Sequence, residues 1–354
     1  MSDRILLATR KGLLTLARNG GGWTIAATEF PGVAVTAVLH DPRDGALYAA
    51  LKHGHFGPKL HRSDDGGRTF SEIATPAFPP DSADAPTLFQ MWTVEAGGAP
   101  GQLWIGALPA GLFRSDDRGG HWQLMSALWN VPERAKWFGG GYDMAGIHSV
   151  STDPRDPARV SIAISCGGVW ESRDNGASWT VDGKGLVAGY MPPDQADVPE
   201  VQDPHRVARC AGAPDTMWMQ HHSGMFRSAD AGATWTQLKP PWDDFGFAVA
   251  AHPSDPQTAW FVPAIKDELR VPRDGALAVT RTRDGGKTWE SLRDGLPQRD
   301  AFDLMYRHGL DVAGGGRQLA MGSTTGSLWL SENAGERWQL VNAHLPPIYA
   351  VRFA

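Results

Sequence analysis

The chain has 354 residues, 42% of them apolar, and a formal net charge of −6. A slightly acidic balance without a basic run disfavours nucleic acid or an anionic membrane as a partner. The two cysteines, Cys166 and Cys210, supply no disulfide framework, and no window approaches the roughly 20 apolar residues that span a bilayer, so we expect a cytoplasmic protein.

The predicted elements are short strands from the first residues onward. The N-terminal segment 1–18 consists of two apolar runs interrupted by Arg4, Arg10 and Lys11, which predicts two strands and not a signal peptide. Downstream, a strand, a turn rich in Pro, Gly or Asp, a second strand, a loop with Gly and a third strand follow one another repeatedly. The 42 glycines and 26 prolines, with little helical periodicity, favour an all-β fold.

Each third strand runs into a polar turn of constant spacing: Ser or Thr, an acidic or amide residue two later, Gly two later and an aromatic residue three after that. The side chain of Asp or Asn can close such a turn, Gly can adopt positive φ, and the aromatic residue can begin the next strand. We therefore expect these aspartates to be structural. The central residues of the six copies lie 49 to 57 residues apart, a period typical of a propeller blade or a solenoid unit: Asp65, Asp117, Asp174, Asp230, Asp284 and Asn333.

This spacing resembles the Asp-box, or bacterial neuraminidase (BNR), repeat of sialidase-like propellers. The fourth copy matches every position of the pattern with Ser228, Asp230, Gly232, Thr234 and Trp235. Other copies depart from it at Phe70, His121 and Arg337. The repeat also occurs in xyloglucan-cleaving glycosidases, sortilin-like receptors and a photosystem assembly factor. The resemblance, over residues 60–338, therefore implies a fold and not a reaction.

The two chain ends are expected to complete the ring. The N-terminal stretch 5–23 supplies a second and a third strand, and the segment 346–354 is an apolar strand without a partner nearby in sequence. The sequence thus predicts one domain, residues 1–354, folded as a seven-bladed β-propeller with Asp-box turns. One blade is closed by the N- and C-terminal strands together, with the C-terminal strand innermost. Six blades with a loose N-terminal hairpin are the alternative.

Four strands per blade place the Asp-box turns on one face of the ring. The loops between second and third strands and the long connections 75–90, 126–147 and 187–206 share the other face, where functional residues are expected. The candidate catalytic residues there are His55, His148, His205 and His222; the candidate substrate-binding residues are Arg10, Lys52, Arg206, Lys266 and Trp137; and the candidate metal ligands are His53, His55 and His222.

Imidazoles converging on this face suggest a bound divalent cation. Three of them can ligate the ion and leave one position open for water, whose pKa then falls. Adjacent residues on a strand point to opposite sides, so only one of His221 and His222 faces the channel. The basic residues Arg10, Arg206 and Lys266 are suited to an anionic portion of the ligand. We predict a metal-assisted hydrolase or lyase for a small organic or carbohydrate-like substrate.

A true sialidase is disfavoured, because the N-terminal stretch lacks the proline of the R-I-P signature of that family. An arginine triad of Arg10, Arg206 and Arg307 would match no known spacing. A glycosidase that uses a carboxylate pair, Asp203 with Asp267 or Glu268, is a further possibility.

A non-catalytic ligand-binding or protein-assembly propeller is the main alternative. Aromatic residues such as Trp92 and Tyr142 in or next to the connections between blades would then form the contact surface. Cys166 is a possible nucleophile but is more typical of a small buried residue. The glycine run in 138–143 suggests a flexible lid or a close backbone approach to a ligand.

Overall fold

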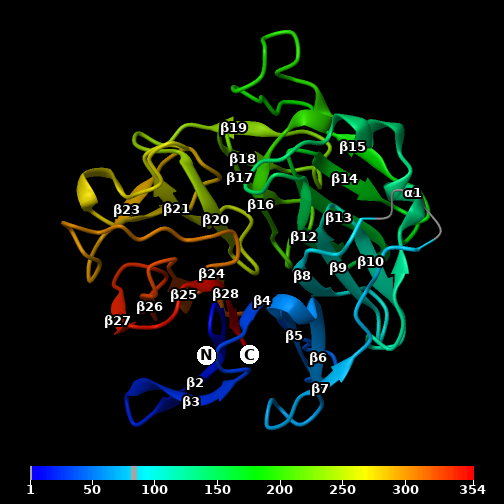
Figure 1. Cartoon of the computed structure of the whole chain (residues 1–354). Coiled ribbons are helices and arrows are strands. Elements are labelled where there is room, and N and C mark those ends of the chain that lie inside the picture. The colour runs from blue at the N-terminus through cyan, green and yellow to red at the C-terminus, as the bar shows by residue number, and fades with distance from the viewer. Residues whose placement is uncertain (1, 81–85) are drawn as a thin grey trace.

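The computed structural model describes residues 2–80 and 86–354, which form seven four-stranded antiparallel sheets. The sheets follow one another around a ring in chain order (Figure 1). The innermost strands contact their neighbours around the centre. This arrangement is a seven-bladed, all-β propeller, as the sequence predicts. Residues 81–85, within the connection 75–90, lie outside the described residues.

From the innermost to the outermost strand, the first three sheets are β28 (Ile348–Phe353), β1 (Arg4–Thr9), β2 (Gly12–Asn19) and β3 (Gly22–Glu29); β4 (Ala34–His40), β5 (Leu47–Lys52), β6 (Pro58–Ser63) and β7 (Ser71–Ile73); and β8 (Gln90–Ala96), β9 (Leu103–Leu108), β10 (Leu112–Ser115) and β11 (Gln123–Leu124). The next two are β12 (Gly146–Asp153), β13 (Asp156–Ser165), β14 (Gly168–Ser172) and β15 (Thr180–Asp182); and β16 (Pro204–Arg209), β17 (Met217–His221), β18 (Gly224–Ser228) and β19 (Thr236–Leu238). The last two are β20 (Phe245–Ala251), β21 (Ala259–Ala264), β22 (Val279–Thr282) and β23 (Glu290–Leu292); and β24 (Leu310–Val312), β25 (Leu319–Gly322), β26 (Leu328–Ser331) and β27 (Gln339–Asn342).

Helical structure is limited to single turns within the connections. In the described residues these are α1 (Ser126–Trp129) and the 3₁₀ helices η1 (Gly54–Phe56), η2 (Pro132–Lys136), η3 (Pro199–Val201) and η4 (Arg273–Gly275). None of the helices found there has the length and apolar character needed to cross a membrane.

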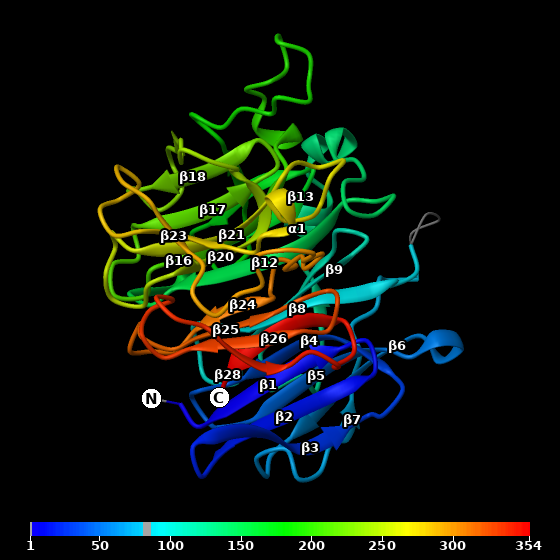
Figure 2. The same cartoon turned by 90° about the vertical axis from the view of Figure 1, so that its left-hand side faces the viewer.

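The two chain ends close the ring together. Strand β28 pairs antiparallel with β1, with Val351 opposite Leu7 and Phe353 opposite Ile5. It is the innermost strand of that blade, and both ends of the chain lie close together beside it (Figure 2). The predicted joint blade is therefore confirmed, and the six-bladed alternative is excluded.

The hydrophobic core lies between adjacent blades. The second strands are buried on both faces, as in β9, where all six residues are buried. Because each blade is covered by a neighbour on either side, these strands are almost continuously apolar and do not alternate. Trp104, Trp218 and Trp260 on these strands are fully buried between blades.

The Asp-box side chains make their hydrogen bonds within their own turns. In the fourth copy, Asp230 Oδ1 accepts hydrogen bonds from the Ser228 hydroxyl (2.8 Å) and the Thr234 backbone N–H (2.9 Å). Asp230 Oδ2 accepts one from the Thr234 hydroxyl (2.6 Å), and Ser228 Oγ accepts one from the Gly232 N–H (2.8 Å). Gly232 has a φ of +98°, which a residue with a side chain rarely adopts. In the last copy Asn333 Oδ1 accepts the two bonds that correspond to those of Asp230 Oδ1, from the Ser331 hydroxyl and the Arg337 backbone N–H. These hydrogen bonds support the expected structural role.

These turns predict part of the pH dependence of stability. The hydroxyl and the backbone N–H of Thr288 both donate to Asp284, which lowers the pKa of Asp284 to about 2. In the unfolded chain that pKa is about 4. The stabilising contribution is therefore complete above about pH 4 and is lost as the pH falls toward 2. Since Asn333 fills the same position with an amide, Asp284→Asn should fold normally. It should also lose less free energy of unfolding than the wild type between about pH 5 and pH 3 in urea titrations.

Asp194→Asn is the matched control for this measurement, because Asp194 is exposed in the long connection 187–206 and belongs to no Asp-box. Its stability should follow the wild-type pH curve. If the Asp284→Asn and wild-type curves ran parallel, the turn carboxylate would not contribute in this way.

Candidate functional site

Two adjoining cavities lie at the N-terminal ends of the innermost strands. Their volumes are about 240 and 630 Å³, and Gly141, Phe247, Arg270 and Arg307 line both. Strand β8 begins at Gln90, which lines the smaller cavity, and ends at Ala96. Ala96 pairs with Leu103, and Leu103 pairs with Ser115, the first residue of an Asp-box. This Asp-box therefore lies at the end of β8 that is away from the cavity. The cavities and the Asp-boxes thus lie on opposite faces, as predicted.

The smaller cavity, which we call the aromatic cavity, is walled by ring side chains. Trp92 and Tyr142 meet edge to face with ring centroids 5.3 Å apart, and Phe247 meets Tyr306 in the same manner at 6.3 Å. Tyr349 lines the cavity as well. Such walls suit a sugar ring or another flat ligand of that size.

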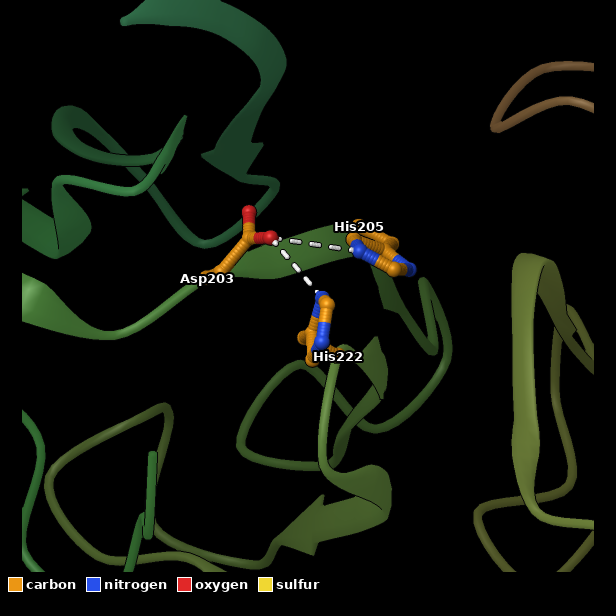
Figure 3. Close-up of side chains that lie close together, drawn as sticks. All are labelled: Asp203, His205 and His222. Carbon is orange, nitrogen blue, oxygen red and sulfur yellow. Dashed lines mark ion pairs between the residues drawn. The ribbon is translucent and has the colours of Figure 1, made fainter. Parts of the chain in front are cut away.

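The larger cavity, which we call the polar cavity, contains a cluster of Asp203, His205 and His222. Asp203 directly precedes β16, and His205 is the second residue of that strand, so the two side chains lie on the same side. His222 follows β17, and its backbone N–H donates to the Asp203 carbonyl oxygen (3.0 Å). Asp203 Oδ2 lies 3.3 Å from His205 Nε2 and 3.5 Å from His222 Nδ1 (Figure 3).

Neighbouring groups orient two of these side chains. Asp203 Oδ1 accepts hydrogen bonds from the Ser165 hydroxyl (3.2 Å) and the Cys166 backbone N–H (3.1 Å), which leaves Oδ2 for the cluster. His205 Nδ1 lies 2.6 Å from the Gly246 carbonyl oxygen, which assigns the proton to Nδ1 and turns the Nε2 lone pair toward Asp203.

The donor set fits a divalent transition-metal ion. One ligand atom from each of the three residues lies within 4.8 Å of the others. Two imidazoles and one carboxylate form a ligand set of zinc and of non-haem iron, and hydrogen bonds like those to Ser165 and Gly246 typically orient such ligands.

The electrostatics of the cluster also favour a cation. Burial opposes ionisation of Asp203, yet His205, His222 and Arg307 together hold its pKa well below the ordinary value. Burial lowers the pKa of His205, which favours the neutral imidazole that metals bind. A positive charge between Nε2 and the carboxylate oxygen, either a proton or a metal ion, makes this contact favourable.

The structure brings four of the predicted site residues to the cleft. His205 and His222 line the polar cavity together with Lys266, whose Nζ lies 3.4 Å from Glu268. Lys52 lines the aromatic cavity, where its Nζ lies 3.4 Å from the ring centroid of Phe89. His221 is fully buried against Phe226, so of this adjacent pair only His222 faces the cleft.

The remaining predicted residues line neither of the two cavities in the described structure. His148 is buried, with Nδ1 3.0 Å from Ser149 Oγ and Nε2 2.8 Å from the Pro204 carbonyl oxygen. Trp137 packs edge to face on Trp170 with centroids 5.6 Å apart. The other four are the half-buried Arg206 and His53 and the exposed His55 and Arg10.

Sequence reasoning missed two features of this cleft. It considered Asp203 as an acid or base and not as a ligand, although the spacing of 203 and 205 in an extended strand signals that they share a side. It gave no role to Arg307 outside a rejected arginine triad, and no local pattern marks that residue.

The fold and the cleft define a seven-bladed propeller with a ligand-sized opening on the face away from its Asp-boxes. No protein-family model matches the chain. It is similar to a probable oligoxyloglucan-reducing end-specific xyloglucanase of Neosartorya fischeri, with 23% identity over 274 residues, 68% of this chain and 30% of that protein. The chain thus spans less than a third of that relative.

Two solved structures share the fold. The GH74 xyloglucanase of Xanthomonas campestris has a TM-score of 0.66 at 20% identity, covering 97% of this chain and 53% of that one. YCF48 of Cyanidioschyzon merolae has a TM-score of 0.59 at 13% identity, covering 89% and 86% of the two chains. At these identities the similarity concerns the propeller fold alone.

Proposed function

We propose that this propeller is a hydrolase for a carbohydrate-like substrate and that Asp203, His205 and His222 hold a divalent cation it requires. The observation that carries the proposal is the convergence of these three side chains inside a ligand-sized cleft, with Asp203 and His205 each oriented by a further hydrogen bond. The similarity to a xyloglucanase supports a carbohydrate as the substrate class.

The two cavities have different proposed roles, sugar binding in the aromatic cavity and cation binding in the polar cavity. Trp92, Phe247 and Tyr306 form walls against which a sugar ring can pack. Ser165 and Gly246 fix the orientations of the ligands Asp203 and His205. A divalent cation bound there would supply Lewis acidity toward water or a substrate oxygen.

Carboxyl groups at the polar cavity are the candidates for proton transfer. They are Asp244, Asp267 and Glu268, all of which line it. One of them would protonate the leaving oxygen of the substrate while another group accepts the proton of the attacking water.

Chelation tests this proposal directly. We expect the purified chain to release reducing ends from soluble xyloglucan oligosaccharides, to lose this activity on dialysis against a chelator, and to regain it with Zn²⁺ or Mn²⁺. His222→Ala should lower cation affinity at least tenfold, because even residues that only support a metal ligand typically contribute 10- to 100-fold. Elemental analysis and initial rates measure the two effects.

His53→Ala is the matched control, since His53 lies in the corresponding loop of another blade and lines neither cavity in the described structure. It should leave both quantities unchanged. Activity that survives full chelation would overturn the cation requirement. Cation-dependent sugar binding without any turnover would instead support a non-catalytic binding propeller.

A further inference from the structure

Arg307 is a buried cation, two of whose nitrogens have no hydrogen-bond partner among the described residues. Its side chain lines both cavities and is only 6% exposed. Nε and Nη2 are buried and have no hydrogen-bond acceptor among the described residues. The guanidinium carbon lies 4.7 Å from the ring centroid of Trp92 and 5.3 Å from that of Phe247, so the charge is enclosed between two aromatic side chains.

Such an arrangement is costly unless an anion completes it. A buried charge without hydrogen bonds is strongly destabilising, and the aromatic faces offset only part of that cost. A guanidinium does not lose its proton in proteins, so deprotonation cannot remove the desolvation cost of the buried charge. The unpaired Nε and Nη2 form the edge of the guanidinium that binds two oxygens of one carboxylate or phosphate group.

The rest of the aromatic cavity has the same electrostatic character. Lys52 and Arg270 line it beside Arg307, and no acidic residue is among its lining residues in the described structure. Arg270 pairs with Asp267. Asp203 in the polar cavity offsets part of the Arg307 charge, but no described residue accepts a hydrogen bond from its Nε or Nη2, and a ligand can supply that acceptor.

A glycine segment covers Arg307. A Cβ atom added to Gly141 would lie 3.6 Å from Arg307 Nη2 and 3.7 Å from Nη1. A Cβ atom on Gly140 would approach Ser165 Oγ to 2.7 Å and Cys166 Sγ to 2.8 Å. The backbone of 140–141 thus covers both Arg307 and the Asp203 surroundings, and a side chain at Gly140 would clash there. Glycine runs rearrange readily, which would give a ligand access to the buried nitrogens.

We infer that the cleft takes an acidic saccharide, whose carboxylate or phosphate group binds Arg307 while its ring packs on Trp92 and Phe247. This inference rests on the proposed function only in taking the ligand to be a sugar. It adds a preference for a negative charge on the sugar, which the cation site does not explain.

Binding of matched sugars to the whole chain tests the inference. Isothermal titration in the presence of a chelator would compare glucose, glucuronate and glucose 6-phosphate. We expect at least one of the two anions to bind tenfold or more tightly than glucose, and the stronger one identifies the carboxylate or the phosphate as the group bound. Similar affinities for all three sugars, or no binding by any of them, would overturn the inference.

The variant Arg307→Met separates a ligand-binding role from a structural one. It should lose the preference for the acidic sugar, and its melting temperature should not fall, because Nε and Nη2 donate no hydrogen bond to a described residue. Arg10→Met, at an exposed arginine that lines neither described cavity, should keep the preference. An Arg307→Met chain that melts lower or does not fold would show a structural role and overturn the inference.

The chelator keeps this result independent of the proposed hydrolase activity. A preference for acidic sugars without turnover would contradict the proposed function and support the anion site. Turnover of neutral oligosaccharides without that preference would support the proposed function and contradict the anion site.

Discussion

Asp203→Asn should abolish cation binding and hydrolysis while leaving the propeller folded. Asp203 Oδ2 lies close to both histidines, at 3.3 Å from His205 Nε2 and 3.5 Å from His222 Nδ1. Replacing it with an amide removes the negative charge and the strongest oxygen ligand of the group. We expect cation affinity to fall about 100-fold or more, beyond the 10- to 100-fold typical of residues that only support a metal ligand.

The fold should tolerate this change for a specific reason. The amide oxygen can keep the hydrogen bonds from Ser165 and Cys166, and the amide N–H group can then donate to His205 Nε2. The variant places a hydrogen-bond donor beside His205 but removes the carboxylate charge that Arg307 interacts with, so it should fold with a free energy of unfolding about 1–3 kcal/mol below the wild type.

Elemental analysis and hydrolysis rates measure the outcome, with Asp244→Asn as the control. Asp244 lines the same cavity but does not belong to the Asp203, His205 and His222 cluster. Asp244→Asn should therefore retain the bound metal whatever its effect on turnover. An Asp203→Asn chain that still carries one metal ion would place the ion elsewhere.

The fold was predictable from the sequence because its turns are built from local interactions. The hydrogen bonds of Asp230 all lie within its own turn, so the residues responsible are four positions apart or fewer. The repetition of such turns reveals the blades, and the unpaired apolar strand at the C-terminus reveals how the ring closes.

The site was only partly predictable, because a sequence pattern gives the face of a residue but not its place around the ring. His53 and His222 follow the second strands of two different blades, β5 and β17, and both were expected at the channel mouth. Only His222 joins the Asp203 cluster in the described structure. The spacing of Asp203 and His205 was readable from strand alternation, whereas the missing hydrogen-bond partners of Arg307 are visible only in the packed molecule.

A chain that ends at Pro347, and so lacks β28, should lose its cooperative folding transition. Strand β28 fills the centre of the first blade, where Ile348 and Val351 are fully buried. It also contacts β4, β24 and β25 of the neighbouring blades. Without it, β1 becomes an open edge and the ring has no closure. Truncating one buried Leu, Ile or Met side chain costs about 2–5 kcal/mol. The free energy of unfolding of a whole domain is only about 5–15 kcal/mol. The free energy lost with the entire strand should therefore exceed the stability of the domain.

Circular dichroism during heating and size-exclusion chromatography measure this effect. Ile348→Ala should show a partial loss of about 2–5 kcal/mol, and Tyr349→Ala, at a half-buried position of the same strand, a smaller one. A peptide of residues 348–354 added to the truncated chain should restore the transition, because the vacated position offers a strand edge and a buried apolar surface to the same sequence. A truncated chain that melts at the wild-type temperature would mean that the other six blades hold the ring without the closing strand.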